Sequence, residues 1–279
     1  MRKFLKPGTW ELLSPLSNAD FVRLWLANGL WWQAMWMEMM VLGWLALELT
    51  NSPWWVQVVG FYRSIPLLVV GLFGAAITDR FRRRHLVQVL QLGNVLGAGL
   101  LAFLLWIGQL QFWHLSVVSL ALGATWALDW PTRRAMVPDL VGKARTVDAM
   151  VLENVIQGFT RITGPLAAGY IMAAYTSLGA LLILVGLGFL ALISLSGLKT
   201  DSKAPQASAG MREVVKEVRQ GWSYVRASSS IFCVFLITIL MNVWAFPYMT
   251  LLPVFARDVF GQGPEGMGWL GAANGFGAF

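Results

Sequence analysis

The chain has 279 residues, of which 57% are hydrophobic and only 13% are charged, about half the roughly 25% typical of soluble domains. A soluble protein of this length must cover its surface with polar groups, so this composition excludes a soluble globular domain, a disordered chain and a disulfide-rich scaffold. It predicts a protein that crosses a membrane several times. The single cysteine, Cys233, can form neither an internal disulfide nor a cysteine-based metal site.

Seven apolar runs long enough to cross the hydrocarbon core as helices follow one another along the chain, and an eighth begins near its end. The predicted spans are residues 21–47, 54–78, 85–108, 113–136, 148–175, 179–198 and 231–255, and 266 onward. The eighth run is about 14 residues long, short of the roughly 20 that a span needs. We therefore expect an N-terminal fragment of a longer protein, because a half-inserted helix leaves backbone groups unpaired in lipid.

The basic residues lie on one side of the predicted spans. Eighteen of the 21 lysines and arginines fall in or beside the N-terminal segment and the connections after the second, fourth and sixth spans. By the positive-inside rule, these segments and the N-terminus are cytoplasmic, in a multi-pass protein of the bacterial inner (plasma) membrane. The net charge of +7 is therefore a topology signal, and we expect no nucleic-acid partner.

The longest connection divides the chain into three parts. Residues 1–198 form a six-helix transmembrane half, residues 199–230 a cytoplasmic linker, and residues 231–279 the start of a second half. Within the linker, residues 211–225 predict an amphipathic helix with an apolar stripe of Val214, Val218, Trp222 and Val225. We expect this helix to rest on the membrane surface, and the alternative is a cytosolic connector packed on loops.

Polar residues interrupt two of the spans. A charged side chain at mid-membrane costs about 2.5–3.5 kcal/mol and therefore needs a reason. Glu38 lies deep in the first span with no partner on its own helix, so it is either a protonatable site or a carboxyl held neutral by an interhelical hydrogen bond. In the fifth span Glu153, Gln157 and Arg161 recur at every fourth residue. This stripe predicts a water-filled cavity, and the alternative is a Glu153–Arg161 chain buried between helices.

Two further spans carry ionisable groups. Asp129 and Arg133 are one helical turn apart in the fourth span and are expected to pair. Pro131 between them removes a backbone hydrogen bond and is expected to bend the helix. Arg63 in the second span is expected to extend outward to the membrane surface as a structural residue. The alternative is a role for Arg63 in an outer gate.

Fifteen tryptophans are unusual for a chain of this length. Several lie near the predicted membrane interfaces, where the amphipathic indole ring is favoured. Three others, Trp31, Trp32 and Trp36, lie within the first span. We expect these three to pack between helices, and the alternative is an aromatic wall for an apolar substrate.

Two motifs resemble those of the major facilitator superfamily. Residues 74–84 read GAAITDRFRRR, with Asp79-Arg80 and a later basic pair, and this string resembles motif A of the superfamily. The fifth span holds Gly158, Gly164-Pro165 and Gly169, which resembles motif C, the Gly-Pro signature of its exporters. Residues 43–53, 129–140 and 221–226 are similar to the branch that contains enterobactin exporters and macrolide-efflux proteins.

The resemblance implies an all-α membrane protein with two six-helix halves that alternate access to a central cavity. This chain would hold the first six-helix half, helix seven and part of helix eight. Asp79 is then expected to contact the second half and to help close the cytoplasmic side. The loop is expected to be anchored by three arginines: Arg80, Arg83 and Arg84. Gly164 and Pro165 are expected to bend helix five and to allow close packing.

The favoured function is export of a small hydrophobic or amphipathic molecule of the drug or siderophore class, driven by proton antiport. The membrane potential supplies about 2.3 kcal/mol per charge per 100 mV. Glu38 would carry the proton, Glu153, Gln157 and Arg161 would line the path, and the Asp129–Arg133 pair would couple helix movement to protonation. The expected partners are the substrate, protons and the lipid bilayer, without a cofactor or metal, in a protein that is monomeric at full length.

Three alternative functions fit the sequence less well. An uptake transporter of the same fold is disfavoured by Gly164-Pro165. A membrane-embedded enzyme is disfavoured because the sequence has no H-E-x-x-H, G-x-S-x-G or P-loop motif, and because its only histidines, His85 and His114, lie at opposite membrane faces. A seven-helix receptor or light-driven pump is disfavoured because a retinal protein needs a lysine in its last helix for the Schiff base, and all six lysines lie outside the spans.

Overall fold

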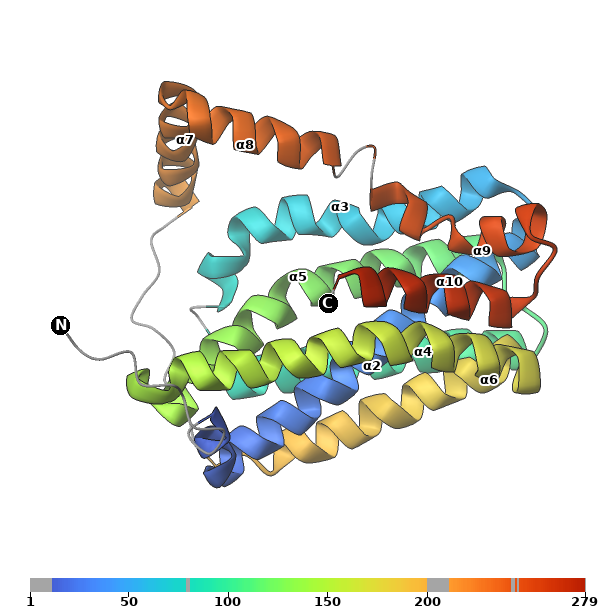
Figure 1. Ribbon diagram of the computed structural model, residues 1–279, viewed down its shortest axis with the longest axis horizontal. Helices are drawn as coiled ribbons and strands as arrows, with labels where there is room; N and C mark the ends of the chain where they lie inside the picture. Colours follow the sequence, from blue (N-terminus) through green and yellow to red (C-terminus); the bar gives the residue numbers. More distant parts are fainter. Residues whose placement is uncertain (1–11, 79–80, 200–210, 242–243, 245, 279) are drawn as a thin grey trace.

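The computed structural model describes residues 12–78, 81–199, 211–241, 244 and 246–278, and these residues contain helices and no strand. The helices are α2 (Ala19–Thr50), α3 (Pro53–Thr78), α4 (Arg83–Trp106), α5 (Phe112–Val141), α6 (Thr146–Ser196), α7 (Met211–Ala227), α8 (Ser229–Leu240), α9 (Leu252–Val254) and α10 (Pro264–Gly277). Helices α2 to α6 occupy the first six predicted spans and lie alongside one another as a bundle (Figure 1). The fold is therefore that of an all-α membrane protein, as expected.

The long element α6 consists of two helices. Its backbone leaves the helical region at Tyr175 and Thr176, where Thr176 takes a φ of 62°. A positive φ is unfavourable for a β-branched residue, so the chain breaks here rather than bending smoothly. The break separates the predicted fifth and sixth spans, which return antiparallel to each other.

Local sequence determines both ends of α2. The side chain of Asn18 accepts hydrogen bonds from the backbone N–H groups of Asp20 and Phe21, at 2.9 and 3.2 Å, and so caps the first turn. Its amide also donates to the carbonyl oxygen of Leu140 at 2.7 Å, which ties this cap to the end of α5. At the other end Asn51 takes a left-handed conformation with φ of 49°, and Pro53 then begins α3.

The bundle interior has two apolar cores with polar groups between them along α2. One core includes Phe21, Leu24 and Ala27 at the start of α2. The other begins at Met37 and continues through the second half of the same helix. Between them lies Asn28, which is 3% exposed and forms hydrogen bonds to other buried polar groups. The candidate site is built on this middle section of α2.

The surface of the bundle is apolar where a soluble protein would be polar. The exposed large side chains of α4 are Val89, Leu92, Leu96, Leu100 and Phe103, with Trp106 at its end. Within the described residues, two segments are long and apolar enough to cross a membrane, namely Arg83–Trp106 and Lys143–Ser196, and the α7–α8 pair is a third if counted as one bent span. The chain is therefore a multi-pass membrane protein.

The seventh predicted span, residues 231–255, is wrong as a single helix. Helix α8 ends at Leu240, and a 3₁₀ turn (Phe246–Met249), the short α9 and a π turn (Phe255–Val259) follow it. Pro247 lacks a backbone N–H and disfavours a regular helix through this position, and Pro253 lies at the start of the short α9, where a proline is tolerated. Helix α7 forms where the amphipathic helix was predicted and meets α8 at 110°. The two helices lie at the edge of the bundle in Figure 1, and α7 comes close to α3.

Helix α10 packs closely against the first half of α6. A methyl group on Gly169 of α6 would lie 2.6 Å from the carbonyl oxygen of Pro264 and 3.0 Å from the Cα of Gly268. One turn further along α10, a methyl group on Gly271 would lie 2.6 Å from the Cβ of Pro165. The motif that resembles the exporter signature therefore forms the contact between these two helices.

This contact makes a matched pair of substitutions in α6 informative. Gly169→Ala should lower the free energy of unfolding by about 1–3 kcal/mol, because the new methyl meets backbone atoms that cannot rotate away. Gly186→Ala has open space around it and should leave stability unchanged or raise it by about 0.4–1 kcal/mol. Unfolding of the purified protein in detergent measures both, and equal effects of the two variants would contradict the packing described.

Candidate functional site

A cavity of about 500 Å³ lies among α2, α3, α5 and α6 and is bordered by Met249 and Thr250. Its volume is within the usual range for pockets that hold drug-sized molecules. Four tryptophans line it: Trp32 and Trp36 from α2, and Trp126 and Trp130 from α5. Its polar lining residues are Arg63, Ser64, Gln157, Arg161 and Thr250. The cavity thus combines a large apolar wall with a few polar groups.

The tryptophans of the first span differ in their surroundings. Trp31 is 5% exposed and lies under the guanidinium of Arg133, 5.1 Å from ring centre to Cζ. Trp32 and Trp36 line the cavity, and the Trp32 ring meets that of Trp130 edge to face at 6.3 Å. The aromatic wall, the less favoured interpretation of these residues, is therefore present at two of the three positions.

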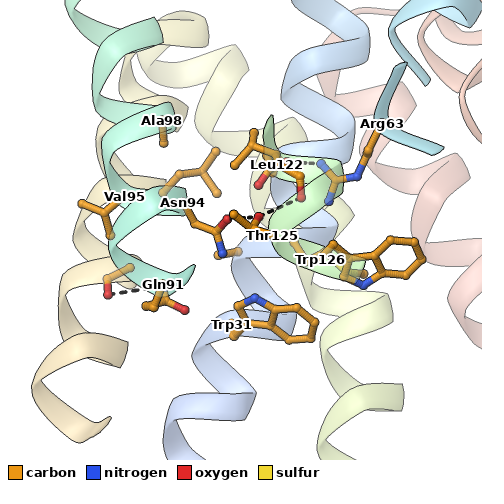
Figure 2. A pocket seen from close by; sticks show the side chains of 14 residues that line it. Trp31, Arg63, Gln91, Asn94, Val95, Ala98, Leu122, Thr125 and Trp126 are labelled. Atoms are coloured by element: carbon orange, nitrogen blue, oxygen red, sulfur yellow. Dashed lines mark hydrogen bonds and ion pairs between the residues drawn. The ribbon is translucent and has the colours of Figure 1, made fainter. Parts of the chain in front are cut away.

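Glu38 and Arg63 form an ion pair between α2 and α3, and each side chain is 14% exposed. The pair borders a second, much smaller pocket of about 30 Å³, which Arg63 enters from the side opposite Gln91 and Asn94 of α4 (Figure 2). Arg63 also lines the large cavity. The partner that Glu38 lacks on its own helix is thus supplied by the neighbouring one.

The expectation that Arg63 extends outward is wrong. Its backbone packs directly against Gly123 of α5, where any side chain would clash with the Arg63 carbonyl oxygen. This close approach brings Arg63 into the bundle, where the attraction to a carboxylate is stronger than at the surface because the dielectric constant is low. The apolar span alone could not show this, because the carboxylate belongs to another helix.

A buried network around Arg133 connects three helices. Within α5, the Arg133 Nε donates to Asp129 at 2.7 Å, as the spacing predicted. Its Nη1 donates to the side-chain oxygen of Asn28 on α2 at 3.1 Å, and its Nη2 donates to that of Gln91 on α4 at 2.9 Å. Asp129 and Arg133 are 0% and 2% exposed, so every bond of this network is removed from water. Sequence reasoning missed Asn28 and Gln91, although each is an amide within an apolar run.

The polar stripe of α6, formed by Glu153, Gln157 and Arg161, belongs to two sites rather than one. Glu153 accepts two hydrogen bonds from the Asn28 amide, both at 3.0 Å, and so joins α6 to the Arg133 network. Arg161 lines the large cavity and donates to the side-chain oxygen of Asn274 on α10 at 3.1 Å. Gln157 lies between them and borders both the cavity and a small pocket beside Glu153. Glu153 and Arg161 thus have different partners, and the alternative of a chain joining them is not formed.

The motif residues of the second connection are only partly described. Asp79 and Arg80 lie outside the described residues. The Arg83 guanidinium donates to the Asp139 carboxylate at 2.7 Å and to the Ala135 carbonyl oxygen at 3.1 Å, both on α5. Arg84 donates to the carbonyl oxygen of Ser196 at the end of α6, at 2.9 Å. These two arginines fasten the start of α4 to its neighbours.

The Gly-Pro pair of α6 packs on two sides. A methyl group on Gly164 would lie 2.5 Å from the Cβ of Trp36, so the absence of a side chain allows α6 to approach α2. Pro165 lies next to Gly271 of α10. Gly164 and Pro165 therefore lie between Trp36, which lines the cavity, and helix α10.

Residues 247–253 border the cavity near the α2–α3 connection. Gln57 of α3 donates to the Pro247 carbonyl oxygen at 3.1 Å and accepts a hydrogen bond from Thr250. A methyl group on Gly43 of α2 would lie 3.0 Å from the Pro253 ring. Sequence reasoning did not identify Gln57, because the residues it binds lie about 190 positions away.

Comparisons with known proteins agree with this architecture. A family described as "Transmembrane secretion effector" matches residues 10–279. The staphyloferrin A transporter of Staphylococcus aureus is 24% identical over 227 residues, which cover 81% of this chain and 56% of that protein. An uncharacterized MFS-type transporter of Bacillus subtilis, YfiS, is 20% identical over 239 residues, covering 83% and 55% respectively. The chain spans about half the length of these curated relatives.

The contribution of Asn28 to stability, through its bonds in the Arg133 network, can be tested by substitution. Asn28→Leu keeps the shape of the side chain but removes its bonds to Arg133 and Glu153, so it should lower the free energy of unfolding by about 1–3 kcal/mol. The matched variant is Asn154→Leu on α6, where the asparagine is exposed and stability should change by no more than about 0.5 kcal/mol. Thermal unfolding in detergent compares the two, and equal stability of both variants would mean that the network contributes nothing.

Proposed function

The chain belongs to the transmembrane secretion effector family of the major facilitator superfamily, and on this premise we propose that it provides one half of a transporter that exports small amphipathic molecules in exchange for protons. The cavity of about 500 Å³ carries the proposal. It combines an aromatic wall with isolated polar groups, as expected of a site for amphipathic molecules. Both relatives are transporters by name, which supports transport as the general activity.

Glu38 is the proposed proton carrier. Its ion pair with Arg63 is neutral overall, so the pair is less costly to bury than either charge alone. Protonation of Glu38 removes the negative member and leaves Arg63 with a net positive charge. Because Arg63 borders both the small pocket at Glu38 and the large cavity, the protonation state of Glu38 then alters the charge that the substrate meets.

The Arg133 network is the proposed link between protonation and helix movement. Its members are on α2, α4 and α5, and Asn28 extends it to Glu153 on α6. Such a network holds the helices in one arrangement while all its bonds are made, so a shift of α2 or α6 must break or exchange several bonds together. This gives the half-bundle discrete positions, which alternating access requires.

Two sets of contacts are the proposed gates. At one end of the bundle, Arg83 and Arg84 hold the motif A connection to α5 and α6, and the undescribed Asp79 and Arg80 are proposed to act with them. At the other end, Gln57 and Thr250 join α3 to the segment after α8. We propose export as the direction, supported by the Gly164-Pro165 pair and by the family's description as a secretion effector.

The placement in the membrane completes the proposal. The protein is proposed to lie in the bacterial inner membrane, with its basic connections and its N-terminus facing the cytoplasm. The cavity would then lie within the depth of that membrane. Residues 1–198 are proposed as the first six-helix half, 199–230 as a cytoplasmic linker whose helix α7 lies at the membrane surface, and 231–279 as the start of the second half. The full-length protein is proposed to act as a monomer.

The proton role of Glu38 is tested by a matched pair on one helix. Glu38→Gln cannot release a proton, so export of fluorescent amphipaths from cells with the full-length protein should lose its dependence on external pH and fall to the level of cells without it. Glu48→Gln should export normally, because Glu48 accepts bonds from Trp44 and Ser177 outside the cavity. If Glu38→Gln retains pH-dependent export and Glu153→Gln loses it, the proton role moves to Glu153.

The direction of transport is tested in inside-out membrane vesicles. Acidifying the vesicle lumen should drive accumulation of a fluorescent amphipath in the lumen, because protons leaving through an exporter exchange for substrate entering. Dissipating the proton gradient with an ionophore should abolish accumulation. Uptake by proton symport gives the opposite sign, with substrate leaving the lumen as it is acidified, and that result would replace export by uptake.

A further inference from the structure

Arg161 differs from the other arginines described within the bundle. Arg63 contacts Glu38, and Arg133 contacts Asp129, so each of these charges has a carboxylate. The described contacts of Arg161 are with neutral groups: its Nη2 donates to the Asn274 side chain at 3.1 Å, and its Cζ lies 5.3 Å from the Trp36 ring centre. Among the described residues, no carboxylate forms a salt bridge with it. The large cavity is therefore lined by one arginine that is neutralised and one that is not.

Three N–H donors at this cavity lack an acceptor. The Nε of Arg161 and the indole Nε1 atoms of Trp36 and Trp126 are buried, and none of them has a hydrogen-bond partner among the described residues. All three side chains line the cavity. A buried donor without an acceptor is costly, and the cost is larger for a charged group than for a neutral one. The side chains line the cavity, but the three nitrogen atoms themselves are shielded from it. The demand on an occupant therefore comes from the charge of Arg161.

The Arg161 guanidinium is the costliest of these groups to leave without a partner, because it carries a positive charge within an apolar bundle. The Trp36 ring and the Asn274 oxygen reduce the cost of burying Arg161 but carry no negative charge. An anionic oxygen group would neutralise Arg161 and form charge-assisted hydrogen bonds, which are about twice as strong as neutral ones. Arg63 makes no such demand while Glu38 is ionised, so the cavity requires one negative charge.

We propose that the cavity selects amphipathic molecules that carry one anionic group, such as a carboxylate, bound by the Arg161 guanidinium. The apolar body of the molecule lies against the Trp126 and Trp130 rings, which are stacked 6.2 Å apart. Asn274 of α10 is a positioning residue, because it holds the guanidinium in place. This inference rests on the proposed transport function, since it specifies the class of substrate for the same cavity.

The test compares two probes that share one aromatic body. In 1-pyrenebutyrate the chain ends in a carboxylate, and in 1-pyrenebutanol it ends in a neutral hydroxyl. Energy transfer from tryptophan to pyrene reports binding to the purified full-length protein in nanodiscs of neutral lipid. The unmodified protein should bind the carboxylate about tenfold or more tightly than the alcohol. Equal affinity for the two probes overturns the proposal without any variant being made.

Two variants locate the selectivity. Arg161→Gln should reduce pyrenebutyrate affinity to that of pyrenebutanol and leave pyrenebutanol binding unchanged. Arg145→Gln removes the same charge at an exposed position away from the cavity and should have no effect. If Arg145→Gln weakens pyrenebutyrate binding as much as Arg161→Gln does, the effect is one of overall charge and the assigned site is wrong.

Transport of the same probes separates this inference from the proposed function. Inside-out vesicles should accumulate pyrenebutyrate faster than pyrenebutanol, and Arg161→Gln should abolish the difference. Export of both probes at rates that Arg161→Gln does not change would overturn the anion site and leave the proposed function standing. Anion-selective binding that depends on Arg161, without movement of either probe, would support the site and count against the proposed function.

Discussion

The structure depends on one constraint: a charged side chain within an apolar helix bundle is costly unless it has a partner of opposite charge or several hydrogen bonds. Arg133 satisfies it through Asp129, Asn28 and Gln91, and in doing so fixes α5 against α2 and α4. Glu153 satisfies it through Asn28 and fixes α6. In a membrane, where apolar surfaces gain little by leaving lipid, these polar contacts carry much of the specificity of helix packing.

Small residues provide the other half of the packing. Gly123 lets α3 approach α5, Gly164 lets α6 approach α2, and Gly169 lets α6 approach α10. Each of these approaches places a functional side chain: Arg63 next to Glu38, the Trp36 ring beside α6, and Asn274 within reach of Arg161. Close backbone contact and polar pairing are therefore coupled, because an arginine can reach its partner only where the helices come close.

The cavity is subject to the same constraint, but apolar side chains outnumber the charged ones in its lining. Its apolar walls are mainly aromatic and sulfur-containing side chains, which can contact ligands of varied shape without directional bonds. Its charges are placed unequally, with a neutral Glu38–Arg63 pair on one side and Arg161 on the other. An apolar space with a fixed and asymmetric charge distribution can hold many bodies but orients them by their polar group.

Features that depend on neighbouring residues could be predicted from the amino-acid sequence. Composition and apolar length gave an all-α membrane protein and the positions of α2 to α6, and the four-residue spacing gave the Asp129–Arg133 pair. It also selected the stripe on α6, although it did not show that Glu153 and Arg161 belong to different sites. The pairings between helices emerged only in three dimensions, because Glu38 and Arg63 are 25 positions apart, Asn28 and Arg133 are 105 apart, and Arg161 and Asn274 are 113 apart. Hydropathy reports how a residue partitions between water and lipid, whereas a pairing depends on which helices pack together, and that is fixed only when the whole bundle forms.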